Sequence, residues 1–283
     1  MRADLHIHTT ASDGRWSPER VVTEVEARGI KLFAVTDHDT VASLPAAEAL
    51  ARQAGLAFLR GVEVSTSLDG HLFHVLAYGF DPAAPALSAL LRENTAMMEQ
   101  YDEDIIAGLI VAGHPIDAGD YASYEYDRAR GGWKALNFLI DRGVCTGVRD
   151  FFDDLLVGMS LEMPAFPHPS EAVVAIRESG GAPVLAHPGV SLRHVGVAEE
   201  TLRPFLDFGI AGLECHHTLH DEAVTRSCLD WCIRHDLLVT GGSDCHGGFV
   251  GRELGRPPVD TADLRLGELK GMILTAAMES RPT

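Results

Sequence analysis

Short apolar segments recur along this chain and lead into histidine or carboxylate side chains. In the first segment, His6 and His8 alternate with Leu5 and Ile7, so a strand would place both imidazoles on one face. Segments with the apolar spacing of helices separate these runs. This alternation predicts a mostly parallel α/β fold, in which the carboxyl ends of neighbouring strands share one rim.

Local signals place the individual elements. Ser17 followed by Pro18 is typical of a helix N-cap, and Gly29 ends that helix. Further helices are expected near residues 43–54, 199–208 and 221–235. Strands are expected over residues 30–36, 56–66, 71–80, 182–186, 210–215 and 237–246.

The pattern changes near residue 81. Apolar residues from Leu87 to Val111 recur at helical spacing, shorter helices are expected near 134–142 and 148–157, and no convincing strand lies between 82 and 165. We therefore predict three parts: the first part of an α/β domain over residues 1–81, a helical insertion or lid over 82–165, and the rest of that domain over 166–283.

Composition limits the functions open to the chain. With 41 acidic and 23 basic residues the net charge is −18, which argues against a long nucleic acid as a partner. A small anion remains possible, because bound divalent metals would make a site locally positive. No run reaches the roughly 18 apolar residues that a membrane span needs. Five cysteines without CxxC spacing fit a reducing compartment, and no signal-peptide pattern begins the chain, so we expect a cytoplasmic protein.

Residues of metal-ligand type follow five separate strands. Two histidines alone would also fit an ordinary polar strand face, but the repetition at one predicted rim favours a metal site. Imidazole and carboxylate groups without thiolate suit Zn, Mn or Fe rather than a structural cysteine-based zinc site. The residues concerned are His6 and His8, His38, Glu63, His187, and Asp244 with His246.

These residues lie in short motifs: DLHIHT with Asp13, TDHD at 36–39, GVE at 61–63, HVLAYG at 74–79, AHP at 186–188, GLE at 212–214 and GSDCH at 242–246. Taken together, the motifs resemble the polymerase and histidinol phosphatase (PHP) domain family. They occur in the family's order over the whole chain outside the insertion. The insertion resembles a branch with nucleotide phosphatases, including nucleoside bisphosphate phosphatases, and a 5′-to-3′ exoribonuclease.

The resemblance implies a distorted seven-stranded (β/α)7 barrel with two or three divalent metals, Mn, Zn or Fe. It assigns one metal to His6, His8, Glu63 and Asp244. A second would be bridged by Glu63 and held by His74 and His187, and a third would be held by Asp13, His38 and His246.

Four further residues are candidates for catalysis. Asp37 precedes a predicted ligand and could orient an imidazole or cap a helix. His220 follows Glu214 by six residues, as in the family, and could contact substrate or protonate a leaving group. Relatives tend to carry an Arg-x-His pair that touches phosphate; here Arg130 and Lys134 could supply that charge around Gly131-Gly132, or could form a solvated basic turn. His71 is expected on the strand face opposite His74, and no role is assigned to His216 and His217.

These expectations predict a metal-dependent phosphoesterase that hydrolyses a small nucleotide-like phosphate ester, by attack of a metal-bridging hydroxide on phosphorus, and releases phosphate. Three alternatives remain. The altered insertion loop is compatible with a cyclic phosphodiester hydrolase. A histidinol-phosphate phosphatase is disfavoured by the short insertion. A non-catalytic metal-binding accessory module is disfavoured because all nine predicted ligands are present.

Overall fold

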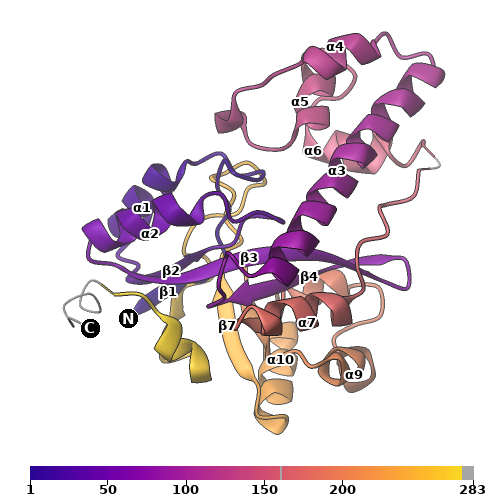
Figure 1. Cartoon of the computed structure of the whole chain (residues 1–283). Coiled ribbons are helices and arrows are strands. Elements are labelled where there is room, and N and C mark those ends of the chain that lie inside the picture. Colours follow the sequence, from indigo (N-terminus) through magenta and orange to yellow (C-terminus); the bar gives the residue numbers. More distant parts are fainter. Residues whose placement is uncertain (160, 276–283) are drawn as a thin grey trace.

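The computed structural model describes residues 1–159 and 161–275, which form an α/β fold around one strongly curved sheet (Figure 1). The strand order is β7-β6-β5-β4-β3-β2-β1-β8. The strands are β1 (Arg2–Asp4), β2 (Leu32–Val35), β3 (Ala57–Leu68), β4 (His71–Tyr78), β5 (Ala182–Leu185), β6 (Gly212–His217), β7 (Leu238–Gly242) and β8 (Val259–Asp260).

The sheet closes on itself through the residues that follow β1. Leu5 N donates to Gly241 O at 3.1 Å, and Ile7 forms a parallel bridge with Cys245. These contacts bring the β1 and β7 ends of the sheet together, which confirms the predicted barrel class. The sheet has eight strands rather than the predicted seven, because the two-residue strand β8 pairs antiparallel with β1.

The direction of β4 differs from the mostly parallel arrangement predicted. Strand β4 runs antiparallel to both β3 and β5, whereas β1–β2–β3 and β5–β6–β7 are parallel. Only Asp69 and Gly70 join β3 to β4, with φ of 51° and 76°. Parallel neighbours need a crossover of a dozen or more residues, so this two-residue turn enforces a hairpin.

Helices cover the outside of the sheet. The Ser17 hydroxyl accepts from Arg20 N and Pro18 opens α1, so the predicted helix start is confirmed. Val21 and Val25 of α1 pack with Phe33 and Phe58 of the sheet. The helices outside the insertion are α1 (Pro18–Ala27), α2 (Leu44–Gln53), α7 (Pro169–Glu178), α8 (Pro188–Ser191), α9 (Glu199–Phe208), α10 (Glu222–Arg234) and the 3-10 helix η3 (Gly267–Met272).

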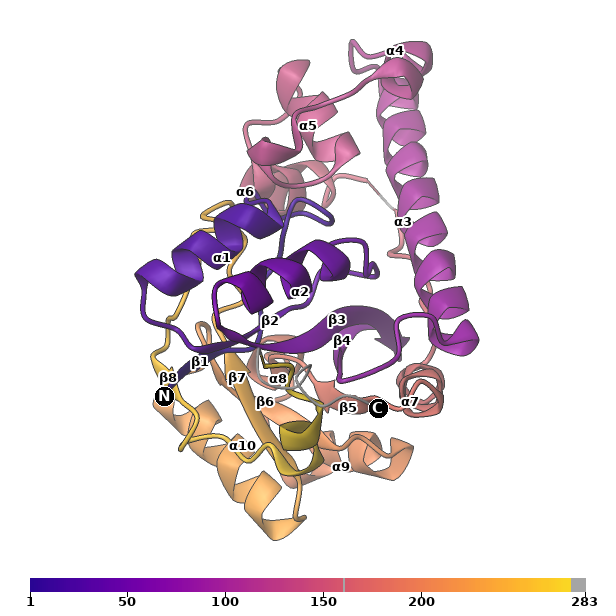
Figure 2. The same cartoon turned by 60° about the vertical axis from the view of Figure 1, so that its left-hand side comes forward.

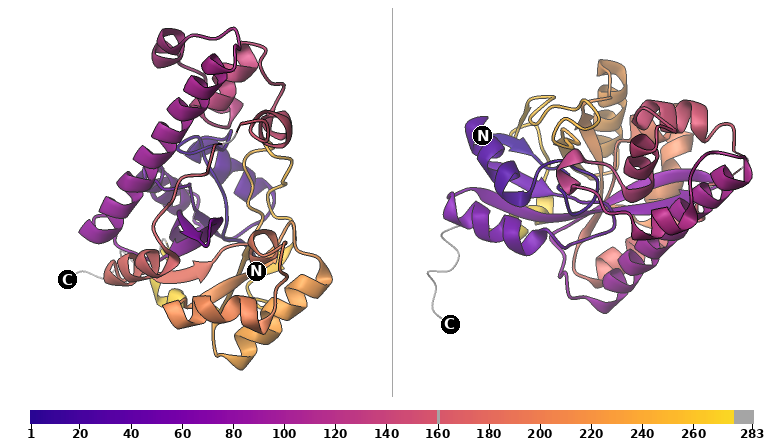
Figure 3. Two further views of the ribbon diagram at one scale, coloured as in Figure 1. Left: turned by 90° about the vertical axis from the view of Figure 1, so that its right-hand side faces the viewer. Right: turned by 90° about the horizontal axis from the view of Figure 1, so that it is seen from above.

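Between β4 and β5 the described residues form helices and loops and no strand. Figures 1 and 2 show α3 leading away from the sheet to α4 and α5, and Figure 3 shows the same long helix along one side of the molecule. These helices share a hydrophobic cluster of their own, which includes Ile105, Leu136 and Phe138. They are α3 (Pro85–Val111), α4 (Ala118–Ser123), η1 (Arg128–Arg130), α5 (Lys134–Asp141), α6 (Val148–Asp150) and the π-helical turn η2 (Phe151–Leu155).

Two sets of hydrogen bonds hold this helical segment against the barrel. Asn94 of α3 donates to Asp39 Oδ1 at 2.7 Å and to Ser65 O at 2.8 Å. At the other end, Gly132 N donates to Asp13 O at 2.7 Å. The Gly131-Gly132 turn therefore lies directly beside one of the predicted metal ligands. In the described part of the chain, no helix combines the length and the apolar character that crossing a membrane requires.

Candidate metal centre

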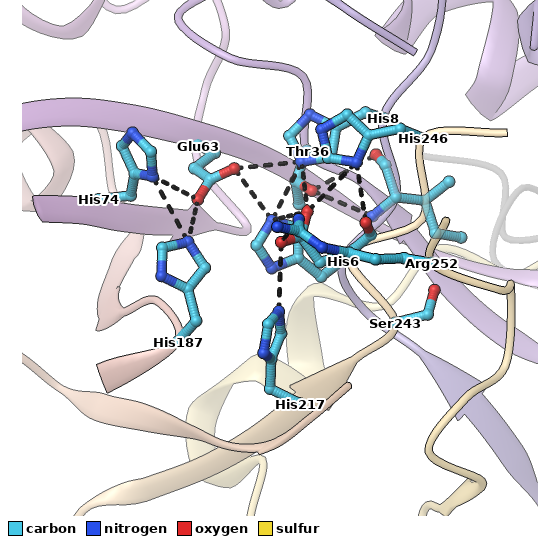
Figure 4. Close-up of polar contacts among 12 residues, drawn as sticks. His6, His8, Thr36, Glu63, His74, His187, His217, Ser243, His246 and Arg252 are labelled. Atoms are coloured by element: carbon cyan, nitrogen blue, oxygen red, sulfur yellow. Dashed lines mark hydrogen bonds and ion pairs between the residues drawn. The ribbon is translucent and has the colours of Figure 1, made fainter. Parts of the chain in front are cut away.

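The nine predicted metal ligands come together where β1, β2, β5 and β7 end, with Glu63 added from within β3 and His74 from within β4 (Figure 4). Donor atoms of eight of these residues form overlapping groups in which every atom lies within 4.8 Å of the others, and the ninth residue, His187, contacts Glu63 directly. The groups are His6, His8, Glu63 and Asp244; His8, Asp13, His38 and His246; and His38, Glu63 and His74.

Glu63 lies at the centre of the arrangement and is 1% exposed. Its Oε2 atom lies 3.0 Å from His6 Nε2, 3.1 Å from His8 Nε2 and 3.4 Å from His38 Nδ1. Its Oε1 atom faces the other way, as Figure 4 shows, and lies 3.0 Å from His74 Nδ1 and 2.9 Å from His187 Nε2. One carboxylate thus connects two separate sets of imidazoles.

Two further donor residues, Asp13 and His246, lie next to His8. His246 Nε2 is 3.2 Å from Asp13 Oδ2, and the rings of His8 and His246 stack with centroids 4.0 Å apart. His8 Nδ1 is buried without a hydrogen-bond partner, 3.6 Å from Asp13 Oδ1. Such an atom costs free energy unless something satisfies it, and a cation held between these groups would do so. The residues present therefore fit a metal.

Buried carboxylates and imidazoles lie next to one another in the cluster and shift each other's pKa values. Burial alone would lower the pKa of His6, but Glu214 and Glu63 outweigh it and hold that pKa well above its usual value. Burial would raise the pKa of Glu63, but the surrounding imidazoles, His6 first, hold it well below its usual value. For His38, burial and the repulsion from His8 prevail over the attraction of Glu63 and lower the pKa to about 3. The cluster therefore combines an ionised carboxylate with imidazoles, and a divalent cation bound there would replace the proton that the carboxylates hold on His6, so the donor set suits divalent cations.

The backbone around the cluster is held in uncommon conformations. His187 and Asp244 have φ of 27° and 53°, in the left-handed region that residues other than glycine rarely adopt. The buried Asp4 carboxylate accepts from the N–H groups of Ser243 at 2.9 Å and Gly255 at 2.8 Å, and so fixes the chain next to Asp244. Surrounding contacts thus maintain a strained backbone at two of the predicted ligands.

Three residues to which the sequence analysis assigned no role in the site contact the ligands. Glu214 accepts from His6 Nδ1 and from His187 N, both at 2.9 Å. His217 Nε2 lies 3.2 Å from Asp244 Oδ2, and Arg252 forms an ion pair with the same oxygen.

A β-bulge explains why His217 was missed. Residues 214 and 217 are three apart, so a regular strand would place them on opposite faces. The pairing with β7 shifts by one residue between Glu214 and His216, which returns the His217 side chain to the site. The available signal was a strand ending in Glu-x-His-His, the same kind of ending that identified the other ligands. Arg252 lies in the loop after β7, and no local pattern predicts its position.

The four candidate catalytic residues are engaged elsewhere. Asp37 accepts hydrogen bonds from Thr9, Ser12 and Ser43, and among its described contacts there is no histidine, so these contacts do not support the prediction that it orients an imidazole. His220 Nε2 accepts from Gly189 N, and its Nδ1 lies 3.0 Å from Cys215 O. Both ring nitrogens of His220 therefore hold β6 and α8 together, which leaves neither free to protonate a leaving group.

Arg130 and Lys134, the two candidates in the insertion, are also bonded to other groups. Arg130 makes a bidentate ion pair with Asp141, with both N–O distances 2.8 Å. Lys134 donates to Ala122 O and lies over the Tyr121 ring. The prediction that these charges face the reacting phosphoryl group is therefore not met in this structure, because both are paired within the insertion.

Comparisons with known proteins agree with this architecture. The chain is 30% identical over 276 residues to a phosphoribosyl 1,2-cyclic phosphate 1,2-diphosphodiesterase of Eggerthella lenta (88% of this chain, 95% of the relative). It is 33% identical to a 3′,5′-nucleoside bisphosphate phosphatase of Chromobacterium violaceum (97% and 98%) and 31% identical to a 5′-3′ exoribonuclease of Haemophilus influenzae (89% and 93%). The solved structure of a candidate metal-dependent phosphoesterase from Bifidobacterium adolescentis matches with a TM-score of 0.78 and 29% identity, over 90% of this chain and 91% of that one.

The barrel, the cluster of imidazoles and carboxylates and these relatives together define a metal-dependent phosphoesterase, a hydrolase of phosphoric esters. The PHP domain family matches residues 4–136 directly. The chain belongs to the PHP domain family.

Proposed function

We propose that this chain hydrolyses a small nucleotide-like phosphate ester at a centre of two or three divalent metals, Mn, Zn or Fe, and releases phosphate. The observation that carries the proposal is the convergence of nine donor residues, among them Glu63, whose two oxygens face separate sets of imidazoles. His6, His8, Glu63 and Asp244 would hold one metal, Glu63, His74 and His187 a second, and Asp13, His38 and His246 a third. Metals bound there would lower the pKa of a water molecule and polarise the phosphoryl oxygens.

The residues around the ligands have supporting roles in this proposal. Glu214 bonds His6 Nδ1 and thereby leaves Nε2 of the same ring directed at Glu63 and the proposed metal. His217 and Arg252 both contact Oδ2 of Asp244, which leaves Oδ1 facing His6 and His8. Arg130 and Lys134 are paired within the insertion. Among the described residues, Arg252 is instead the arginine that contacts a proposed ligand, Asp244.

The proposal also divides the chain into three parts. Residues 82–165 would act as a helical lid on a barrel formed by 1–81 and 166–283; residues 160 and 276–283 lie outside the described part. The separate hydrophobic cluster of the insertion and the contact of Gly132 with Asp13 support this division. The excess of acidic residues supports a small substrate over a long nucleic acid, although one relative is named as an exoribonuclease.

A cyclic phosphodiester is the second candidate substrate. It is favoured because Arg130 and Lys134 are paired within the insertion and because one relative is named as a cyclic phosphate diesterase.

The test is a screen of the purified protein, loaded with Mn, Zn or Fe, against nucleoside bisphosphates, nucleoside monophosphates, cyclic nucleotides, histidinol phosphate and a short RNA. We expect phosphate release from a nucleotide monoester to be the fastest reaction. Faster ring opening of a cyclic diester would favour the second candidate. Metal-replete protein that hydrolyses none of these compounds would contradict both.

A further inference from the structure

A hollow of about 250 Å³ opens beside the candidate metal centre, on the side of His74 and His187. Its other walls come from the start of β4 and from α8 with the turn that follows it. His71 and His194 stand on these walls with their rings stacked, at a centroid distance of 4.2 Å and an angle of 24°. A molecule that contacts the proposed ligands His74 and His187 would therefore have this hollow within reach.

The hollow carries an uncompensated positive charge. Arg193 lines it and is exposed, and within the described residues no carboxylate pairs with its guanidinium. Most arginines of the described surface do have an acidic partner, as expected for a chain with 41 acidic and 23 basic residues. A guanidinium without such a partner, next to two stacked imidazoles, is suited to bind an anion, and its planar donor pattern matches a phosphate.

We propose that Arg193, together with His71 and His194, binds a second phosphate of the substrate while the reacting phosphate lies at the metal centre. The proposal rests on the proposed function and specifies its substrate class as an ester with two separate phosphate groups. It also gives a role to His71, which the sequence placed on the strand face opposite His74 and for which it predicted none. His71 pairs with Leu68 and is exposed, whereas His74 pairs with Ser65, and both side chains line the hollow.

The test compares Arg193→Ala with the wild-type protein on adenosine 3′,5′-bisphosphate and on adenosine 3′- and 5′-monophosphate. Arg226→Ala is the matched control, because Arg226 is an exposed arginine of α10 paired only with the exposed Glu222. Binding of the remote phosphate is the same in the ground and transition states, so we expect KM for the bisphosphate to rise about tenfold with little change in kcat. Both monophosphates should be unaffected, and His194→Ala should shift KM in the same direction by less.

Equal effects of Arg193→Ala on all three substrates, or no effect, would overturn the proposal. If the wild-type protein hydrolyses none of them, equilibrium binding decides the point separately from catalysis. Adenosine 3′,5′-bisphosphate should then bind the wild-type protein about tenfold more tightly than it binds Arg193→Ala, while adenosine monophosphates bind both proteins equally. A bisphosphate that does not bind the wild-type protein, or binds both proteins alike, would remove the second phosphate site.

Discussion

Glu63→Gln offers the sharpest test of the proposed metal centre. The wild-type carboxylate is almost fully buried and contacts His74 and His187 through one oxygen and His6 and His8 through the other. Glutamine keeps the shape but retains only one oxygen, and its uncharged amide is a poor ligand for the proposed metals. Because both oxygens are assigned to metals, the variant should lose more than one metal equivalent per chain.

Glu214→Gln is the matched control. Glu214 is equally buried and also bonds two groups of the centre, His6 Nδ1 and His187 N, but neither of its oxygens is assigned to a metal. Loss of such an orienting group typically lowers metal affinity by about 10–100-fold. At saturating metal, Glu214→Gln should therefore bind the same number of metal ions as the wild-type protein.

Elemental analysis of metal-replete, gel-filtered protein measures the difference, and circular dichroism establishes that each variant is folded. In turnover, Glu63→Gln should lose at least about 100-fold in kcat, on the scale of removing one electrostatic contact to the transition state. The reasoning fails if folded Glu63→Gln retains the wild-type metal content, or if Glu214→Gln loses as many equivalents at saturation.

The structure makes three further predictions. Arg130→Ala and Lys134→Ala should leave kcat and KM unchanged, and loss of the half-exposed Arg130 ion pair should cost at most about 1 kcal/mol in denaturant unfolding; a lower kcat in either variant would return these residues to the active site. Burial raises the pKa of Asp102 to about 7, so its ionisation should reduce stability as the pH rises from about 4 to 7. Asp102→Asn should therefore be more stable than the wild-type protein at pH 8, by up to about 4 kcal/mol, with a much smaller difference at pH 5; a difference independent of pH would contradict this. Arg252→Ala should weaken metal binding about 10–100-fold in a metal titration, and an unchanged affinity would show that Arg252 does not orient Asp244.

Sequence periodicity was sufficient for the α/β class, for most elements and for the residues that directly follow strands, and the resemblance to the PHP family added the barrel and further ligands such as Asp13 and His74. The physical reason is local: strand and helix periodicities are short, and parallel strands bring their carboxyl ends to one rim. His6, His8, His38, His187 and Asp244 follow apolar strands directly, so the fold class implies that they are near one another. Their motifs were also sufficient to indicate the PHP family.

Other features depend on contacts between distant segments, and only the tertiary structure decided them. The bulge in β6 is defined by its pairing with β7, so whether His216 or His217 faces Asp244 could not be read from strand alternation. Arg130 and Lys134 have the right charge for a phosphate site, but Arg130 is paired with a carboxylate on α5 and Lys134 with a carbonyl of α4. Competition among partners for a charged side chain is settled by three-dimensional packing, and for that reason the ligands could be predicted from the sequence while the residues around them could not.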